Sequence, residues 1–221
     1  TSLPIEIALV VTQQDKIVGK NSTPTPNAVK SFAKAHTIDV AHSLSGFDCS
    51  YRGIDIAFLF AYGKIIKPDL LRAPKFGFWN LHPSMLPNFR GAAPTVYPLI
   101  LGKDQTGVSL TVMDDDLDHG PIIDQVGYRI QPTLLNNELL TQLTAIGYDL
   151  FAKHIVRLAN GEINYAELPV QNHASATFTR TLKRDDGRIE LSLIKKALNN
   201  ENIASEELPM IIQQYLGKNS I

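Results

Sequence analysis

The sequence has one cysteine, Cys49, in 221 residues, so no disulfide can form within the chain. A domain that depends on internal disulfides is therefore excluded, and a reducing compartment is expected. No apolar run reaches the roughly 20 residues that a transmembrane helix needs. The first residues also lack the basic region and the long apolar core of a signal peptide. These absences together predict a cytoplasmic protein.

The sequence also has no large excess of positive or negative charge. The chain has 21 Lys and Arg against 22 Asp and Glu, which gives a formal net charge of -1. Because no basic excess is present, composition does not predict a nucleic-acid partner. The apolar fraction of 44% with 19% charged residues is typical of a globular domain with one sizeable core.

The most informative stretch is residues 80–94, with the sequence NLHPSMLPNFRGAAP. The apolar and aromatic residues of 76–82 predict a strand, whose alternation places Asn80 and His82 on one side. An amide beside an imidazole can stabilise an oxyanion, as acyl transfer requires. An Asn-x-His pair is more often a structural pair at a strand end, but Pro83 and Pro87 stiffen the loop that follows and favour a functional reading.

A second polar stretch follows a predicted strand at residues 106–113. It has the sequence DDDLDHG at residues 114–120 and supplies carboxylates that could orient an imidazole. The ordinary interpretation is a solvated acidic loop. Calcium is a poor alternative because Glu138 lies too far on to close a twelve-residue EF-hand loop, so we predict no metal.

The remaining pattern predicts an α/β protein, with apolar runs for strands and amphipathic stretches for helices. A helix that begins after Asn27 and a long helix capped by Asn136 are the clearest. His154 near the end of the second is expected to be a surface or partly packed histidine rather than a ligand. Further strands are expected at 5–11, 54–60 and 121–130, and further helices at 93–101, 191–198 and 205–215.

Residues 82–87 and 89–94, with Leu117, Asp118 and Gly120 downstream, resemble the formyltransferase family that uses 10-formyltetrahydrofolate. The ending Arg-Gly-Ala-Ala-Pro is most similar to its methionyl-tRNA formyltransferase branch. Residues 176–189 give a second match to that branch and disfavour the glycinamide ribonucleotide branch. The resemblance implies an open, mostly parallel Rossmann-like sheet with flanking helices.

The resemblance also implies an enzyme that transfers the formyl group of 10-formyltetrahydrofolate to the amino group of initiator methionyl-tRNA. Asn80, His82 and Asp118 take the places of the family's catalytic residues. The positions that correspond to folate contacts are Tyr62, Gly63, Ile65, Ile66, Asp114, Asp115 and Asp116. Those that correspond to acceptor contacts are Ser84, Leu86, Pro87, Arg90, Gly91, Lys16 and Lys20. For Lys16 and Lys20 a solvated lysine loop is an equally good interpretation.

The sequence departs from the family at both ends. Residues 1–189 are expected to form the catalytic domain without the family's first strand, and residues 190–221 a helical tail where members continue into a tRNA-holding β-barrel. Three alternatives stay open: a sugar-nucleotide formyltransferase, a formyltetrahydrofolate hydrolase, and a non-catalytic folate-binding remnant.

Overall fold

The computed structural model describes residues 3–17, 23–44, 53–199, 201–204 and 208–209. The chain divides into two compact units, residues 1–78 and 79–221. Each unit combines helices and strands, which confirms the α/β class. In the described part of the chain, no helix is both long and apolar enough to cross a membrane.

The first unit consists of short elements. β1 pairs with β4 in parallel, and β2 pairs with β3 in antiparallel. The Asn27 side chain caps α1 by accepting a hydrogen bond from the Lys30 N–H, as predicted. The elements are β1 (Val10–Val11), β2 (Lys16–Ile17), β3 (Pro24–Thr25), α1 (Ala28–Ala35), β4 (Val40–Ala41), β5 (Ala57–Leu59) and α3 (Pro68–Leu71).

Two predicted strands of this unit are wrong in extent and burial. The strand expected at 5–11 is reduced to Val10–Val11, and Ile5 and Ile7 are 41% and 51% exposed. The strand expected at 54–60 is reduced to Ala57–Leu59, with Phe58 41% exposed. An apolar run favours burial but does not supply a pairing partner, and a strand extends only as far as its ladder hydrogen bonds.

The second unit is built on an antiparallel ribbon and one long helix. β6 pairs with β8 and β8 with β9, both antiparallel, while β7 and β10 form a short parallel pair. The elements are β6 (Phe78–His82), β7 (Arg90–Gly91), α4 (Val96–Ile100), β8 (Gln105–Val112), β9 (Ile122–Arg129), α5 (Asn136–Ala159), β10 (Phe178–Thr179) and α6 (Leu191–Leu198).

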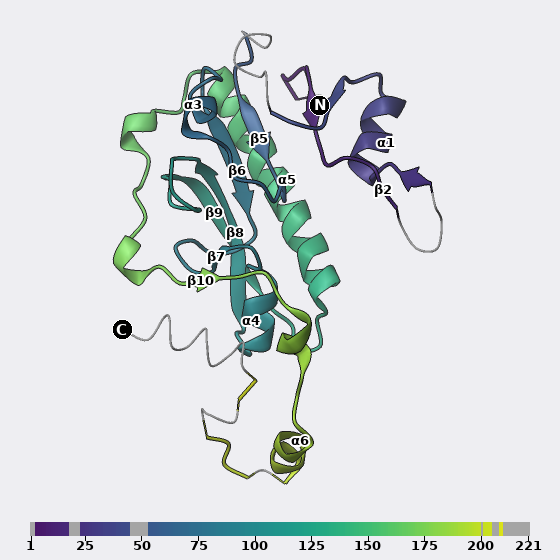
Figure 1. Ribbon diagram of the computed structural model, residues 1–221. Helices are drawn as coiled ribbons and strands as arrows, with labels where there is room; N and C mark the ends of the chain where they lie inside the picture. Colours follow the sequence, from purple (N-terminus) through teal and green to yellow (C-terminus); the bar gives the residue numbers. More distant parts are fainter. Residues whose placement is uncertain (1–2, 18–22, 45–52, 200, 205–207, 210–221) are drawn as a thin grey trace. The chain divides into compact units, whose positions relative to one another are not determined.

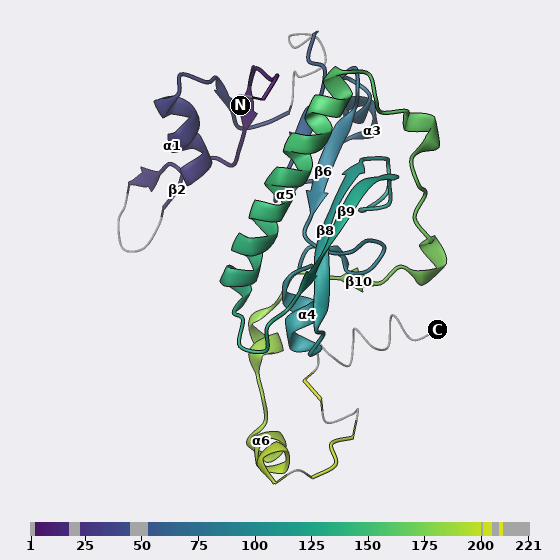
Figure 2. The same ribbon diagram turned by 180° about the vertical axis from the view of Figure 1, so that it is seen from behind.

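Helix α5 lies along one face of β6, β8 and β9, as both views show (Figures 1 and 2). Trp79 packs edge-on against Phe151 with ring centroids 6.4 Å apart. A Cβ placed on Gly147 would lie 2.2 Å from Leu81 Cδ2, so glycine lets the helix approach the strand closely. Because Trp79 and Leu81 point toward α5, alternation turns Asn80 and His82 to the opposite face.

Two helix predictions need correction. Helix α4 begins at Val96 rather than at 93, since Pro98 has no N–H to donate to the carbonyl of Pro94. Asn136 is the first residue of α5 rather than its cap; Leu135 precedes the helix, and its N–H donates to Glu138. The tail helix at Leu191–Leu198 is confirmed, whereas the one expected at 205–215 lies outside the described residues.

Candidate active site

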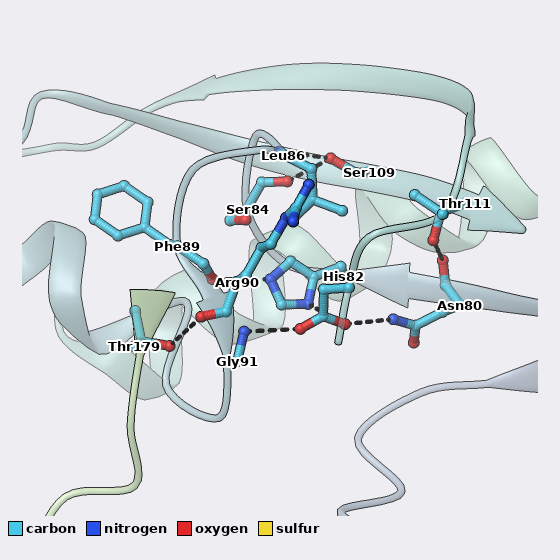
Figure 3. Close-up of polar contacts among 12 residues, drawn as sticks. Asn80, His82, Ser84, Leu86, Phe89, Arg90, Gly91, Ser109, Thr111 and Thr179 are labelled. Atoms are coloured by element: carbon cyan, nitrogen blue, oxygen red, sulfur yellow. Dashed lines mark hydrogen bonds and ion pairs between the residues drawn. The ribbon is translucent and has the colours of Figure 1, made fainter. Parts of the chain in front are cut away.

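The carboxylate of Asp118 has three polar neighbours at the end of β6. Its Oδ1 accepts a hydrogen bond of 3.2 Å from Asn80 Nδ2 and lies 3.6 Å from His82 Nδ1. Its Oδ2 accepts a hydrogen bond of 2.7 Å from the Gly91 N–H. Figure 3 shows Asn80, His82 and Gly91 arranged around this carboxylate. The structure therefore brings together the three predicted catalytic side chains.

The imidazole of His82 is buried, with 4% of the residue exposed. Its Nε2 lies 3.0 Å from the carbonyl oxygen of Phe89, and its Nδ1 faces Asp118. Both ring nitrogens thus face oxygen acceptors, an arrangement that the form with two N–H donors satisfies. The Nδ1 edge is the edge that His82 shares with Asn80 and Asp118.

The loop after β6 is fixed by a buried hydroxyl of the neighbouring strand. Ser109 Oγ donates to the Ser84 carbonyl at 2.7 Å and accepts from the Leu86 N–H at 3.0 Å. Gln125 Nε2 donates to the same hydroxyl at 2.7 Å and to the Leu86 carbonyl at 2.9 Å. The peptide bond before Pro87 is cis. This network shapes the loop that leads to Phe89 and Gly91.

The segment before and within β10 holds the other side of the same loop. The Phe89 N–H donates to Thr177 Oγ1 at 2.8 Å, and Thr179 Oγ1 donates to the Arg90 carbonyl at 3.0 Å. Gly91 has φ +103°, and a Cβ there would lie 2.3 Å from the Thr179 carbonyl oxygen. The predicted exit segment is thus part of the site's framework.

Arg90 is buried and makes its hydrogen bonds to uncharged groups. Its guanidinium donates to Gln171 Oε1 at 2.6 Å and 3.2 Å and to His173 Nδ1 at 2.9 Å. Burial lowers the pKa of Arg90, which the charge of Asp118 counteracts. The amide of Gln171 continues the network to the carbonyls of Asp118 and Gly120.

The acidic loop is partly ordered by its own side chains. His119 Nδ1 lies 2.6 Å from Asp114 Oδ2, and the His119 ring stacks on His173 with centroids 3.7 Å apart. Asp114, Asp116, Asp118 and His119 line a hollow of about 10 Å³ next to Asn80. Asp115 and Asp116 are exposed. In the described part of the chain, no His, Cys, Asp and Glu residues are grouped as a metal site would require.

Of the residues predicted to contact the acceptor, Ser84, Leu86 and Arg90 are buried, and Ser84 Oγ donates to the Asn88 carbonyl at 2.6 Å. Their polar groups serve the framework of the loop, and contact with an acceptor stays a prediction. Lys16 is exposed and its Nζ donates to Gln13 Oε1, whereas Lys20 lies outside the described residues.

The residues predicted to contact folate fall in both units. Asp114, Asp115 and Asp116 belong to the second unit, as do the three predicted catalytic side chains. Tyr62, Gly63, Ile65 and Ile66 belong to the first unit, where Gly63 has φ +70°, Ile65 is 98% exposed and Ile66 is 6% exposed. Contact of this loop with folate stays a prediction.

Sequence reasoning missed Gln171 and His173 and misjudged His154. His154 is 1% exposed and its Nε2 lies 2.7 Å from Asp124 Oδ2, so it is fully buried rather than on the surface or partly packed as expected. A histidine on the buried stripe of α5 could have signalled a buried partner. No local signal distinguishes Gln171, because its partners lie more than 50 residues earlier in the chain.

Comparison with known proteins places this geometry in a family. The Formyl transferase family model matches residues 1–155, which include Asn80, His82 and Asp118. The chain belongs to the formyl transferase family. Membership confirms the resemblance read from residues 82–94 and 117–120.

Curated relatives come from the methionyl-tRNA branch of this formyl transferase family. The chain is 37% identical over 194 residues to the methionyl-tRNA formyltransferase of Chloroflexus aurantiacus, covering 85% of this chain and 62% of that protein. It is 32% identical over 218 residues to that of Carboxydothermus hydrogenoformans, covering 96% and 70%. The chain thus spans a little under two thirds of the first of these relatives.

Solved structures of formyltransferases share the fold. Phosphoribosylglycinamide formyltransferase from Bacillus halodurans is 27% identical, with a TM-score of 0.58 over 74% of this chain and 86% of that one. The N-formyltransferase from Helicobacter canadensis, in complex with folinic acid and dTDP-3-aminofucose, is 21% identical, with a TM-score of 0.64 over 96% and 80%. The second likeness, at its low identity, shows the fold alone.

Proposed function

We propose that the whole protein transfers the formyl group of 10-formyltetrahydrofolate to the amino group of initiator methionyl-tRNA. The observation that carries the proposal is the carboxylate of Asp118, which contacts Asn80, His82 and the Gly91 N–H. The relatives with 32–37% identity, all methionyl-tRNA formyltransferases, support this acceptor over the sugar nucleotides and glycinamide ribonucleotide of other members.

The reaction begins when the free amine of the methionyl group attacks the formyl carbon. The carbonyl oxygen becomes an oxyanion, and the second N–H of Asn80 Nδ2 donates to it, since the first is bound to Asp118. The imidazolium of His82 stabilises the same oxygen through its Nδ1 edge. The reacting carbon therefore sits where Asn80, His82 and Asp118 meet.

Proton transfers complete the exchange. The attacking nitrogen becomes cationic on bond formation and loses its proton toward Asp118, which lies beside the site of attack. The leaving N10 of the folate takes up a proton as its bond to the formyl carbon breaks, and His82 is the donor within the site. The products are the N-formylmethionyl ester of tRNA and tetrahydrofolate, so atoms and charge balance.

The folate contacts are assigned from the chemistry of the residues and from the resemblance to formyltransferases. We place the pterin at the loop of Tyr62, Gly63, Ile65 and Ile66, where backbone groups are accessible beside apolar side chains. Independently, the resemblance assigns residues 114–116 of the second unit as folate contacts. Asp115 and Asp116 are exposed and can accept hydrogen bonds from the amino groups of a pterin.

We propose that residues 1–189 are the catalytic domain and that residues 190–221 are a helical tail. Lys16, which is exposed, and Lys20 fall in the segment that would approach the acceptor arm. Because the net charge is -1, the overall charge of this chain does not favour tRNA binding.

The test is transfer of a labelled formyl group by the full-length protein and its His82→Ala and Asp118→Asn forms. Each change should lower kcat by at least about 100-fold, because each removes part of the preorganised charge distribution. Asp149→Asn on the exposed face of α5 is the matched control and should leave transfer unchanged. Turnover near the wild-type rate in either site variant would refute the assignment.

Measuring formyl transfer to different acceptors distinguishes the proposed function from its alternatives. Transfer to methionyl-tRNA supports the proposal, whereas transfer to an amino sugar nucleotide in its place supports the sugar-nucleotide branch. Formate release without any amine identifies a hydrolase. Folate binding with no transfer to any acceptor identifies a remnant.

A further inference from the structure

We propose that Gln171 is a positioning residue that holds the catalytic carboxylate of Asp118 in place, an inference that rests on the function proposed above. Gln171 lies 53 residues after Asp118 in the chain and is 4% exposed. Its amide bridges the buried guanidinium of Arg90 and the backbone of residues 118–120.

The backbone at Asp118 needs support. Asp118 has φ +48°, in the left-handed region that residues with a Cβ rarely occupy. Such a conformation persists only where surrounding contacts impose it. The end of this turn is also tight, because a Cβ on Gly120 would lie 1.9 Å from the Val112 carbonyl oxygen.

Gln171 contacts two backbone carbonyls of this turn, that of Asp118 and that of Gly120. Its Nε2 donates to the Asp118 carbonyl at 3.0 Å and to the Gly120 carbonyl at 2.8 Å. The chain that carries Gln171 is itself anchored to the start of β9, where the Ile122 N–H donates to the Pro169 carbonyl at 2.9 Å. The two amide hydrogens therefore clamp a turn that local sequence does not favour.

Arg90 fixes which end of the amide faces the turn. A guanidinium has only donors, and its Nε and Nη2 both point at Gln171 Oε1, at 3.2 Å and 2.6 Å. The amide nitrogen must then face the two carbonyls, which have only acceptors. Arg90 is in turn held by His173 Nδ1 at 2.9 Å. The orientation is thus determined by chemistry at both ends of the side chain.

We call the two hydrogen bonds from Gln171 Nε2 to the carbonyls of Asp118 and Gly120 the clamp. One substitution removes these two donors selectively. Gln171→Glu keeps the shape and gives Arg90 a charged partner, but it places an oxygen opposite the Asp118 and Gly120 carbonyls. Two donors are lost without loss of volume, and the ion pair with Arg90 preserves the buried network. The turn, and with it the carboxylate, should then relax toward a commoner backbone conformation.

Gln171→Glu also adds a negative charge near Asp118, so a neutral variant is needed. Gln171→Met removes both amide donors without changing the charge, and the Arg90 guanidinium keeps its hydrogen bond to His173 Nδ1. A loss seen in both variants reports the missing donors, whereas a loss in Gln171→Glu alone would be a charge effect and would overturn the proposal. Gln142→Glu, on the exposed face of α5, is the matched control for the substitution itself.

The first measurement is steady-state formyl transfer by the full-length protein. We expect kcat to fall about 100-fold in both clamp variants, as a misplaced catalytic group would cause, while KM for the formyl donor changes less than about threefold. A kcat within about twofold of wild type in either folded variant would overturn the proposal. Absence of transfer by the wild type refutes the proposed function instead.

The second measurement does not depend on activity. The Gly91 N–H donates to Asp118 Oδ2 at 2.7 Å, so its hydrogen exchange reports where that carboxylate lies. We expect slow exchange in the wild type and in Gln142→Glu, and exchange at least about tenfold faster in both clamp variants. Unchanged protection of Gly91 in the clamp variants would show that Gln171 does not position Asp118.

Discussion

The N–H of Gly91 and Oδ2 of Asp118, 27 positions apart in the chain, are joined by a hydrogen bond of 2.7 Å. The two oxygens of this carboxylate therefore have different partners. Oδ2 binds the loop backbone, and Oδ1 faces Asn80 and His82. The backbone at Gly91 therefore sets the direction from which Asp118 meets the imidazole.

Replacing Gly91 by alanine should disrupt both the loop and the reaction. Gly91 has φ +103°, and the new Cβ would lie 2.3 Å from the Thr179 carbonyl oxygen, which belongs to backbone and cannot easily move. We expect a loss of about 1–3 kcal/mol in the free energy of unfolding together with a lower kcat. Thermal unfolding and formyl transfer measure the two effects. Gly127→Ala, where a Cβ meets nothing within 4 Å, should be much milder; an equal loss there would contradict the argument.

Asn80→Ala should act on the rate rather than on folate binding. The change removes the oxyanion donor and one partner of Asp118, and loss of such a donor typically lowers kcat by about 10²–10³-fold. KM for the formyl donor should stay close to the wild-type value. Steady-state kinetics at saturating acceptor measure both constants, with exposed Asn137→Ala as the control. A rise in KM at unchanged kcat would assign Asn80 to binding.

Ser109→Ala should destabilise the loop that leads to the site. The hydroxyl is fully buried and has hydrogen bonds with the Ser84 carbonyl, the Leu86 N–H and Gln125 Nε2. Removing it leaves buried groups without a partner, for a cost of about 1–3 kcal/mol in the free energy of unfolding. Denaturant unfolding measures the loss. Ser175→Ala, at an exposed hydroxyl, should cost far less.

Asp124 should make stability sensitive to acid. Burial raises the pKa of this carboxyl, but hydrogen bonds from Lys153, His154 and the Gln125 N–H lower it from 3.8 to about 2. Because the folded-state pKa is the lower one, the stabilisation is complete above pH 3.8 and is lost as the pH falls toward 2. It amounts to roughly 2 kcal/mol on the scale of 1.36 kcal/mol per pKa unit.

Asp124→Asn tests this linkage through thermal unfolding at pH 7 and pH 3. The variant should be less stable at pH 7, and the difference from wild type should shrink at pH 3. Asp149→Asn, on the exposed face of α5, controls for the general loss of a carboxylate. A difference that stays constant between the two pH values would show that Asp124 does not titrate as described.

That Asn80 and His82 lie on the same side of one strand could be predicted because the signal is local, whereas their catalytic role stays a prediction. Asn80 and His82 are two positions apart in one strand, and period-two alternation holds for any strand whatever it pairs with. Asp118 was assigned from the resemblance, since four aspartates in residues 114–118 give no physical reason to prefer one. Its left-handed backbone and its contacts became visible only in three dimensions.

The supporting residues could not be predicted because their partners are distant in sequence. Gln171 and Thr179 contact residues that are 51 to 89 positions earlier. Gln171 stands in no motif that the sequence shows, and the match at residues 176–189 gives no role for the Thr179 hydroxyl. The predicted extent of the strands at Val10 and Ala57 was wrong for a related reason. Burial of an apolar run depends on which strand pairs with it, and hydrophobicity alone does not encode that choice.

Residues 171–179 have a consequence for recombining this chain with its homologues. They lie beyond residues 1–155, where the family model matches, yet they bind the turn at Asp118 and the loop at Arg90. A crossover placed within α5 would take the three proposed catalytic side chains from one parent and the proposed positioning residue Gln171 from the other. Chimeras joined after Thr179 should inherit both from the same parent and retain activity more often than those joined earlier.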